Sequence, residues 1–182
     1  ITLSKNIDSI YAYTFRDCSS LTSITIPNRV TTIDNEAFVR CSSLKEVTIP
    51  YRVASLGYKA FLECASLEKV TFSAYLERIG SECFSGCTAL TSISLPKSVT
   101  YIGSNAFKSC TALAKVEIED LKAWFDIEFD YVNEGNPTYH SRNLYLNGSA
   151  ITAITVPDGV TTIDANDFSY LDNLKSLTLH DK

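Results

Sequence analysis

A single repeat length organises most of this chain of 182 residues. One phenylalanine, one cysteine and one leucine return every 23 residues. The repeating residues are Phe15, Phe38, Phe61, Phe84 and Phe107; Cys18, Cys41, Cys64, Cys87 and Cys110; and Leu21, Leu44, Leu67, Leu90 and Leu113. A fixed period of about 20–50 residues is typical of a solenoid, in which each unit buries its apolar face against its neighbours. We therefore expect residues 1–182 to form a single domain of stacked coils.

The second repeat illustrates how one coil is built. Leu21 to Pro27 ends in alternating apolar and polar residues with β-branched side chains, which is typical of a half-buried strand. The proline fixes φ and has no N–H group, so it ends the strand and turns the chain. Residues 30–33 predict a second short strand, and Ala37, Phe38 and Cys41 recur in threes, as in a turn of helix or 3₁₀ helix. Each coil is expected to add one strand to a parallel sheet.

The repeat is interrupted after Ile118, and we expect an irregular insert at about residues 120–147. Around its single tryptophan, Trp124, apolar residues alternate with acidic ones, which predicts a segment with one apolar and one acidic face. The apolar residues are Phe125, Ile127, Phe129 and Tyr131, and the acidic ones are Asp126, Glu128 and Asp130. Leu144-Tyr145-Leu146 followed by Asn147-Gly148 predicts a hairpin, because Asn-Gly favours a type I′ turn.

The three acidic residues of the insert are candidate Ca²⁺ ligands, because hard cations prefer several carboxylate oxygens. The glycine and the distal glutamate of an EF-hand loop are missing, however, and the alternation alone explains the spacing. The cysteines form no C-x-x-C pair, and both histidines, His140 and His180, lie outside the regular repeats. We expect no metal ion and no cofactor.

Five of the six cysteines share one repeat position, and Cys83 stands where other coils have Ala37, Ala60 or Ala106. Equivalent residues of stacked coils lie about 4.8 Å apart, whereas the Cβ atoms of a disulfide lie about 3.8 Å apart. A cysteine that replaces alanine acts as a small buried apolar residue. The cysteines are therefore predicted to be reduced and buried.

The sequence contains no catalytic constellation. A serine or cysteine nucleophile requires a neighbouring base and an orienting acid, and neither histidine is placed to serve one. A net charge of −5 and a pI near 5.0 give no reason to expect nucleic acid or an anionic membrane as a partner. No apolar run approaches the roughly 20 residues that span a bilayer. We expect a non-enzymatic, monomeric module. Because the chain opens in the middle of a repeat without an initiator methionine, we also expect it to be a fragment of a longer protein.

The strand spacing L-x-x-I-x-I-P is that of a leucine-rich repeat. The complete pattern, I-P-x-x-V-T-x-I-x-x-x-A-F-x-x-C-x-x-L, resembles the BspA-like leucine-rich repeat family of Treponema-type 23-residue repeats. Ile49 to Leu67 and Leu95 to Leu113 carry the pattern closely, whereas Ser73 and Glu119 replace its proline. The insert also resembles an interruption found in this family, on the basis of Trp124, Asn136-Pro137 and residues 144–148.

This resemblance implies an α/β fold, a right-handed leucine-rich repeat solenoid. A parallel β-sheet would form one face, with short helical or 3₁₀ turns and short strands on the other. The resemblance also implies a secreted or cell-surface protein of bacteria with an adhesin-like role. The expected partner is a host or extracellular-matrix protein, or another surface protein. A structural spacer that presents another domain and a glycan-binding module remain as alternatives.

Two surfaces are candidate binding sites. The first is the outward row of the main sheet, which we expect to run through Thr48, Thr71 and Ser94 and to continue through Glu117, Thr155 and Thr178. A flat row of this kind suits a broad partner, although threonine also favours exposed strands for its propensity alone. The second is the turn edge after the proline, with Arg29, Tyr51, Arg52 and Tyr75, since Tyr and Arg are enriched in binding hot spots.

Overall fold

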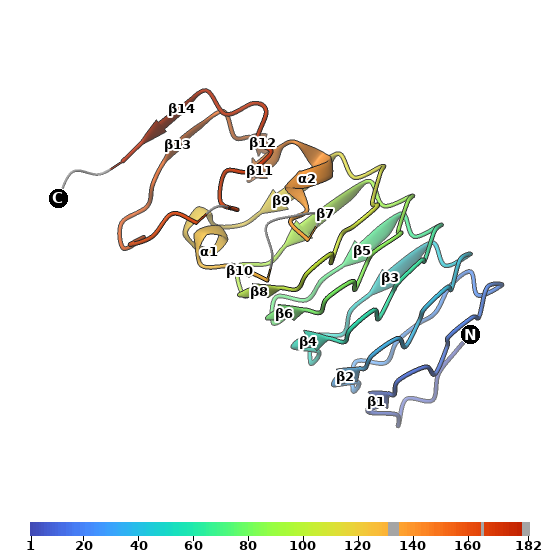
Figure 1. The fold of residues 1–182 in the computed structure, drawn as a ribbon. Helices are drawn as coiled ribbons and strands as arrows, with labels where there is room; N and C mark the ends of the chain where they lie inside the picture. The colour runs from blue at the N-terminus through green and yellow to red at the C-terminus, as the bar shows by residue number, and fades with distance from the viewer. Residues whose placement is uncertain (131–134, 165, 180–182) are drawn as a thin grey trace.

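The computed structural model describes residues 1–130, 135–164 and 166–179, which form a β-solenoid of stacked coils with the two termini at opposite ends (Figure 1). Strand pairing confirms the period of the repeat. Glu46 pairs with Lys69 and Ser92 pairs with Lys115, in each case one repeat apart along the chain. The coils that begin at Glu46, Lys69 and Ser92 have three sides: a strand of a main sheet, a two-residue strand of a second sheet, and a run of turns. In the coil before them, the strand predicted at residues 21–27 is reduced to an isolated bridge between Thr25 and Thr2.

The main sheet is parallel except at one edge, and its strand order is β12-β11-β9-β7-β5-β3. Its strands are β3 (Glu46–Thr48), β5 (Lys69–Thr71), β7 (Ser92–Leu95), β9 (Lys115–Ile118), β11 (Leu144–Leu146) and β12 (Ser149–Ala150). Alternation decides which side chains enter the core. Val47, Ile93 and Val116 are buried, whereas Thr48 and Ser94 point to solvent.

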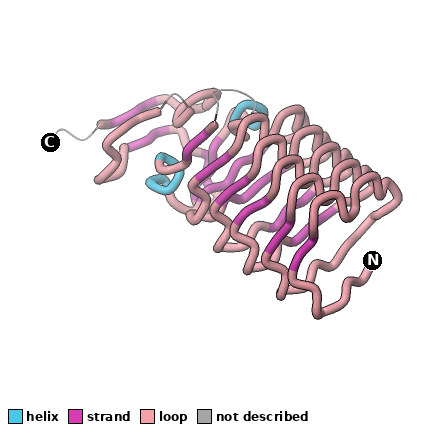
Figure 2. The backbone as a smooth tube through the Cα atoms, turned by 60° about the horizontal axis from the view of Figure 1, so that its bottom comes forward, coloured by secondary structure: helices cyan, strands magenta, loops and turns pink. Residues whose placement is uncertain are grey.

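The second sheet consists of two-residue strands in the order β1-β2-β4-β6-β8-β10. These strands are β1 (Ser9–Ile10), β2 (Thr32–Ile33), β4 (Ser55–Leu56), β6 (Arg78–Ile79), β8 (Tyr101–Ile102) and β10 (Glu128–Phe129). Figure 2 shows both sets of strands repeated coil over coil. The short second strand expected after the proline is therefore confirmed after Pro27, Pro50 and Pro96, whereas residues 160–163 after Pro157 form no strand.

The third side of each coil is a run of hydrogen-bonded turns where the spacing in threes had suggested a turn of helix or 3₁₀ helix. The backbone φ of Glu36 and Arg40 is positive, at 55° and 57°. The N–H groups of Glu36, Phe38 and Arg40 each donate to a carbonyl of the following coil at 2.8 Å. Alternate N–H groups thus bind the next coil while the intervening ones close turns within their own coil, such as Cys41 N–H to Phe38 O at 3.1 Å.

The repeat phenylalanines stack along the interior as a continuous column. Their ring centroids are 5.0 Å apart from Phe15 to Phe38 and from Phe38 to Phe61, and 5.4 Å from Phe61 to Phe84. The column ends at Phe107, 5.6 Å from Phe84, and the rings from Phe38 onward are fully buried. The column is the centre of the core because each ring covers the ring of the next coil.

The cysteine ladder lies beside this column, and all six cysteines are free thiols. The sulfur of each buried repeat cysteine donates to the carbonyl oxygen of the phenylalanine 26 residues earlier, for example Cys64 Sγ to Phe38 O at 3.2 Å. Burial raises the pKa of Cys41 and Cys110 to about 12. The prediction of reduced, buried cysteines is confirmed for five of the six, while Cys18 is half-buried in the first coil.

Thiol titration of the native protein is expected to find at most one reactive group, that of Cys18, and six after unfolding in denaturant. The reason is that buried thiols with raised pKa values supply little of the reactive thiolate. A non-reduced peptide map provides the check on connectivity. Disulfides between successive coils would contradict this account of the ladder.

The insert begins with a helix, not with the extended segment expected from its alternation. Helix α1 (Leu121–Phe125) starts at Asp120, whose carboxylate accepts the N–H of Ala123 at 2.8 Å. Trp124 on this helix is 1% exposed and its indole N–H donates to Asp167 O at 3.0 Å. The alternation holds further on, since Ile127 is buried and Glu128 is exposed on the second-sheet strand β10. Tyr131, the last apolar residue of that pattern, lies outside the described residues.

The rest of the insert returns to the main sheet and completes it. Helix α2 (Thr138–Ser141) leads to β11, which pairs with β9 in parallel so that Tyr145 lies beside Glu117. The predicted hairpin is confirmed: β11 and β12 are antiparallel, with φ of 51° at Asn147 and 81° at Gly148. Strands β13 (Ala153–Thr155) and β14 (Ser176–Thr178) form a separate two-stranded sheet. The expected continuation of the Glu117 row into Thr155 is therefore wrong, because Tyr145 takes that place.

Candidate interaction surface

A groove of about 550 Å³ lies on the exposed face of the main sheet, over β5, β7 and β9. Both Thr71 and Ser94, predicted from the sequence, line it, and Thr48 lies on the same face one strand away. The remaining lining residues are Lys69, Val70, Phe72, Ala74, Ser92, Ile93, Pro96, Lys115, Glu117 and Glu119. Two of the residues predicted from the sequence thus line a hollow that the sequence itself did not predict.

The groove lies where the main sheet is least regular. Strands β7 and β9 pair along four residues, from Ser92 with Lys115 to Leu95 with Ile118, whereas the pairing of β5 with β7 consists of Lys69 with Ser92 alone. The chain departs from the repeat at this point, because Phe72-Ser73 stands where other coils have Ile-Pro or Leu-Pro. The Phe72 ring is half-buried and meets the ring of Phe84 edge-on at 5.8 Å. The shortened pairing and the small side chains above it account for the hollow.

The charges around the groove are arranged by strand direction. Lys69 and Lys115 lie at the beginning of their strands, and Glu117 and Glu119 lie toward the end of the β9 strand and just beyond it. The ammonium group of Lys115 is 2.7 Å from Glu117 and lies 4.8 Å from the centre of the Tyr145 ring. Partial burial opposes ionisation of Glu117, but hydrogen bonds from Lys115 and from the Gly148 N–H outweigh it and lower its pKa.

The structure adds Tyr145 to the sheet face, which sequence reasoning had not placed there. Its register partner is Glu117, and its ring receives the cation of the groove residue Lys115. Leu144-Tyr145-Leu146 has the same apolar–polar–apolar alternation as Val116-Glu117-Ile118. That alternation is the signal from which a further strand of the sheet could have been predicted.

The second candidate surface, the turn edge, forms a separate hollow of about 300 Å³ lined by Asn28, Arg29, Tyr51 and Arg52. Three of the four predicted edge residues thus come together. Tyr75 does not line the hollow; it lies one coil further along the same edge and is 65% exposed. The Nε–H of Arg52 donates to the Tyr51 hydroxyl at 2.9 Å, and the guanidinium lies 5.5 Å from that ring centre.

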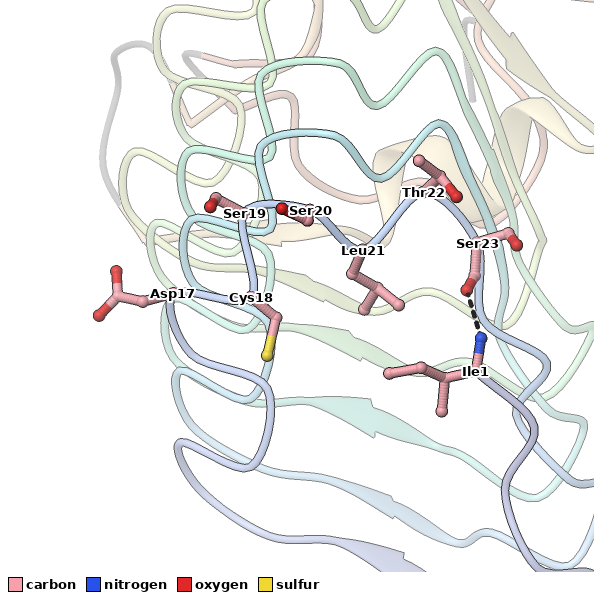
Figure 3. A pocket seen from close by; sticks show the side chains of 8 residues that line it. All are labelled: Ile1, Asp17, Cys18, Ser19, Ser20, Leu21, Thr22 and Ser23. Carbon is pink, nitrogen blue, oxygen red and sulfur yellow. Dashed lines mark hydrogen bonds between the residues drawn. The ribbon is translucent and has the colours of Figure 1, made fainter.

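Two further hollows lie on the end coils of the solenoid. At the N-terminal end, Ile1, Cys18 and Leu21 face a common space of about 470 Å³, beside the hydrogen bond from the Ile1 amino group to Ser23 O (Figure 3). At the other end, a hollow of about 440 Å³ is lined by residues 156–163 and Leu179. In interior coils the equivalents of Cys18 and Leu21 are covered completely, so these hollows are the end faces of the stack.

The acidic residues of the insert do not converge. Among the described residues, no three His, Cys, Asp or Glu side chains gather as a metal ion requires. Asp126 instead pairs with Lys122 of the same helix at 2.6 Å, and Glu128 and Asp130 are exposed. Within the same part of the chain, no helix is long and apolar enough to cross a membrane.

One buried carboxyl group lies outside these surfaces. Asp167 occupies the repeat position of Ala37 and Ala106, is 1% exposed, and receives the N–H of Asp164. Burial raises its pKa to about 6. Its backbone carbonyl is the acceptor of the Trp124 indole, so this residue belongs to the packing of the last coil against the insert.

Stacked 23-residue coils with a parallel sheet on one face define a leucine-rich repeat protein, the class of repeat modules that present a broad surface for protein interaction. A family model described as "BspA type Leucine rich repeat region" matches residues 3–131 and 138–182, in six copies. The chain therefore belongs to the BspA-type leucine-rich repeat family.

Solved bacterial structures share this fold. The chain shares 26% identity with the leucine-rich repeat protein of T. pallidum, at a TM-score of 0.62, covering 98% of this chain and 68% of that one. A leucine-rich repeat protein from Bacteroides ovatus shares 21% identity at a TM-score of 0.51, covering 99% of this chain and 60% of that one. No match was found among the curated proteins.

Proposed function

We propose that this chain is a non-enzymatic interaction module that binds a polypeptide partner through the groove of its sheet face. The observation that carries the proposal is the groove itself, which opens where β5 and β7 pair through a single residue pair. Its lining combines the half-buried Phe72 and the exposed Ala74 with the exposed hydroxyl groups of Thr71 and Ser94. Apolar area and a few hydrogen-bonding groups are what a protein-binding surface requires.

The shape of the surface suits an extended segment of a partner protein. The groove runs over three neighbouring strands, and Thr71 and Ser94 offer small hydroxyl side chains that leave the backbone of the sheet approachable. Lys69 at the start of β5 and Glu119 beyond the end of β9 carry opposite charges, which give such a segment a preferred direction because complementary potentials fix orientation. Tyr145, beside the groove, adds an aromatic group of the kind enriched in hot spots.

The wider role that we propose is adhesin-like. Membership of the BspA-type family supports a secreted or cell-surface location, with a host, extracellular-matrix or other surface protein as the partner. The exposed polar rows of the sheet are consistent with a monomer that keeps this face available. The negative net charge of −5 gives no support for nucleic acid as a partner.

The groove is tested by placing two bulky charges in it. Thr71→Arg combined with Ser94→Glu is expected to weaken binding at least tenfold, about 1.4 kcal/mol, toward a partner found in a surface plasmon resonance screen of purified extracellular-matrix proteins. Both side chains face solvent, so the thermal unfolding curve should change little.

Thr32→Arg with Ser55→Glu is the matched control, because these exposed residues lie on neighbouring strands of the second sheet. The control should bind like the unaltered protein. Equal loss in both variants, or full binding by the groove variant, would overturn the proposal. If binding is instead lost when Asp126, Glu128 and Asp130 are neutralised, the binding site lies on the insert. If no protein in the screen binds, the spacer hypothesis takes the place of this one.

A further inference from the structure

The turn edge of the solenoid carries two arginines at the same repeat position of consecutive coils, Arg29 and Arg52. Their backbones are about one strand spacing apart, roughly 4.8 Å, and both side chains are exposed at a hollow that they line together. We propose that this pair is an oxyanion-binding site, which receives carboxylate groups from an acidic segment of a partner polypeptide. The identity of the partner rests on the proposed function, whereas anion binding by this pair of arginines does not.

The two guanidinium groups lack the ion pairs that hold several other basic residues of this chain. Arg16 pairs with Glu36 at 2.9 Å, Arg40 pairs with Asp17, and Lys59 pairs with Glu82 at 3.4 Å. Within residues 1–130, 135–164 and 166–179, no carboxylate forms an ion pair with Arg29 or Arg52. Two like charges side by side repel each other, and an anion bound between them would remove that repulsion.

Neighbouring side chains restrict the conformation of Arg52 and leave its terminal nitrogens available to a ligand. The Tyr51 hydroxyl accepts from Nε of Arg52 and the ring lies beneath the guanidinium, which restricts the rotamers of a long side chain. The terminal nitrogens then remain to form the paired hydrogen bonds that guanidinium makes with a carboxylate. Asn28 lines the same hollow and adds an amide donor.

This edge is locally positive, although the whole chain has a negative net charge. The chain carries a net charge of −5, yet the turn positions of the first three coils contribute Lys5, Arg29 and Arg52 and no acid. The same two positions hold Lys5-Asn6, Asn28-Arg29 and Tyr51-Arg52 in turn. A positive edge on an acidic protein attracts an anionic group specifically to this place.

The position of the edge favours an acidic peptide over other anions. Ala74, which lines the sheet groove, occupies the repeat position of Tyr51 one coil further along. The hollow and the groove are therefore neighbours on one surface, and a polypeptide that lies in the groove can extend its acidic residues to the arginines. Carboxylate is also the anion with which this chain already pairs Arg16 and Arg40.

The site is tested with hexaglutamate as the probe, titrated into the ¹⁵N-labelled protein at physiological salt. We expect saturable shifts centred on the backbone amides of Asn28, Arg29, Tyr51 and Arg52, and none of comparable size with hexaglutamine. Arg29→Gln combined with Arg52→Gln should weaken hexaglutamate binding at least tenfold. Lys45→Gln combined with Lys108→Gln removes the same charge from two other exposed positions and should leave binding unchanged.

Each contrary outcome overturns the inference in a different way. If the lysine double variant weakened hexaglutamate binding equally, the effect would be one of net charge in general. If hexaglutamine bound equally well, the site would not be selective for carboxylate groups. Tighter binding of a sulfated hexasaccharide at these amides would assign the site to a glycan. If the groove variant loses the partner protein while the arginine variant keeps both the partner and hexaglutamate, the proposed function stands and this inference falls.

Discussion

Phe61→Ala is expected to lower the free energy of unfolding by about 3–5 kcal/mol, the usual cost of removing a buried aromatic ring. Phe61 is fully buried, and its ring stacks on Phe38 and Phe84 with centroid distances of 5.0 and 5.4 Å. The truncation opens a cavity in the middle of the column and removes two ring contacts at once. Urea unfolding followed by circular dichroism measures the change.

Two further variants, both expected to cost less, serve as comparisons. Phe61→Leu keeps most of the volume and should cost much less than the alanine variant. Phe15→Ala removes the half-buried ring at the first coil, which has a stacked neighbour on one side only, and should cost less than Phe61→Ala. A loss below about 1 kcal/mol for Phe61→Ala would mean that the column is not the centre of the core.

Trp124→Ala is expected to cost a similar amount, about 3–5 kcal/mol, but for a different reason. Its indole joins the insert to the last coil: it is 1% exposed, meets Phe129 edge-on at 5.6 Å and donates to Asp167 O. Loss of this side chain should therefore loosen the C-terminal coil before the regular repeats. Hydrogen exchange of the amides in β13 and β14, compared with those in β5 and β7, measures that difference.

Trp124→Phe separates packing from hydrogen bonding, because it keeps an aromatic ring and removes the N–H donor. It should recover most of the stability lost in the alanine variant and leave the Asp167 carbonyl without the indole donor. If exchange accelerates equally in β5 and in β13, the insert is not a distinct junction and the assignment of Trp124 is wrong.

The regular coils were predictable because their apolar pattern repeats without change. Phe38, Cys41 and Leu44 are fully buried, as their period requires, and the two short strands per coil follow from alternation and proline. The run of turns was harder to predict, for two reasons. A run of turns and a turn of helix have the same spacing of apolar residues, and Glu36 and Arg40 adopt positive φ without the glycine or asparagine that normally signals it.

Only part of the insert could be predicted, because its alternating segment overlaps the end of a helix. The alternation of Phe125, Ile127 and Phe129 suggested a strand, but Asp120 caps a helix that begins before it. The alternation of Leu144-Tyr145-Leu146 indicates a strand, but its pairing with β9 is a tertiary contact that a local pattern does not specify.

Of the candidate surfaces, the sequence located single residues but not the hollows they form. The substitution of Phe72-Ser73 for the usual apolar residue and proline was visible in the sequence. That it shortens the pairing of β5 with β7, and so opens a groove at Thr71 and Ser94, follows only from the three-dimensional register. Tyr75 similarly shares an edge with Arg52 without reaching its hollow.

The bonds between coils have a mechanical consequence. The N–H groups of Glu36, Phe38 and Arg40 cross from one coil to the next, so they lie along the line that joins the two ends of the molecule. Tension between those ends pulls such bonds apart lengthwise, and one coil boundary can open without the others because each coil touches only its neighbours. A released coil of 23 residues adds roughly 75–80 Å of extended chain. Under load we therefore expect the solenoid to lengthen in steps of one repeat.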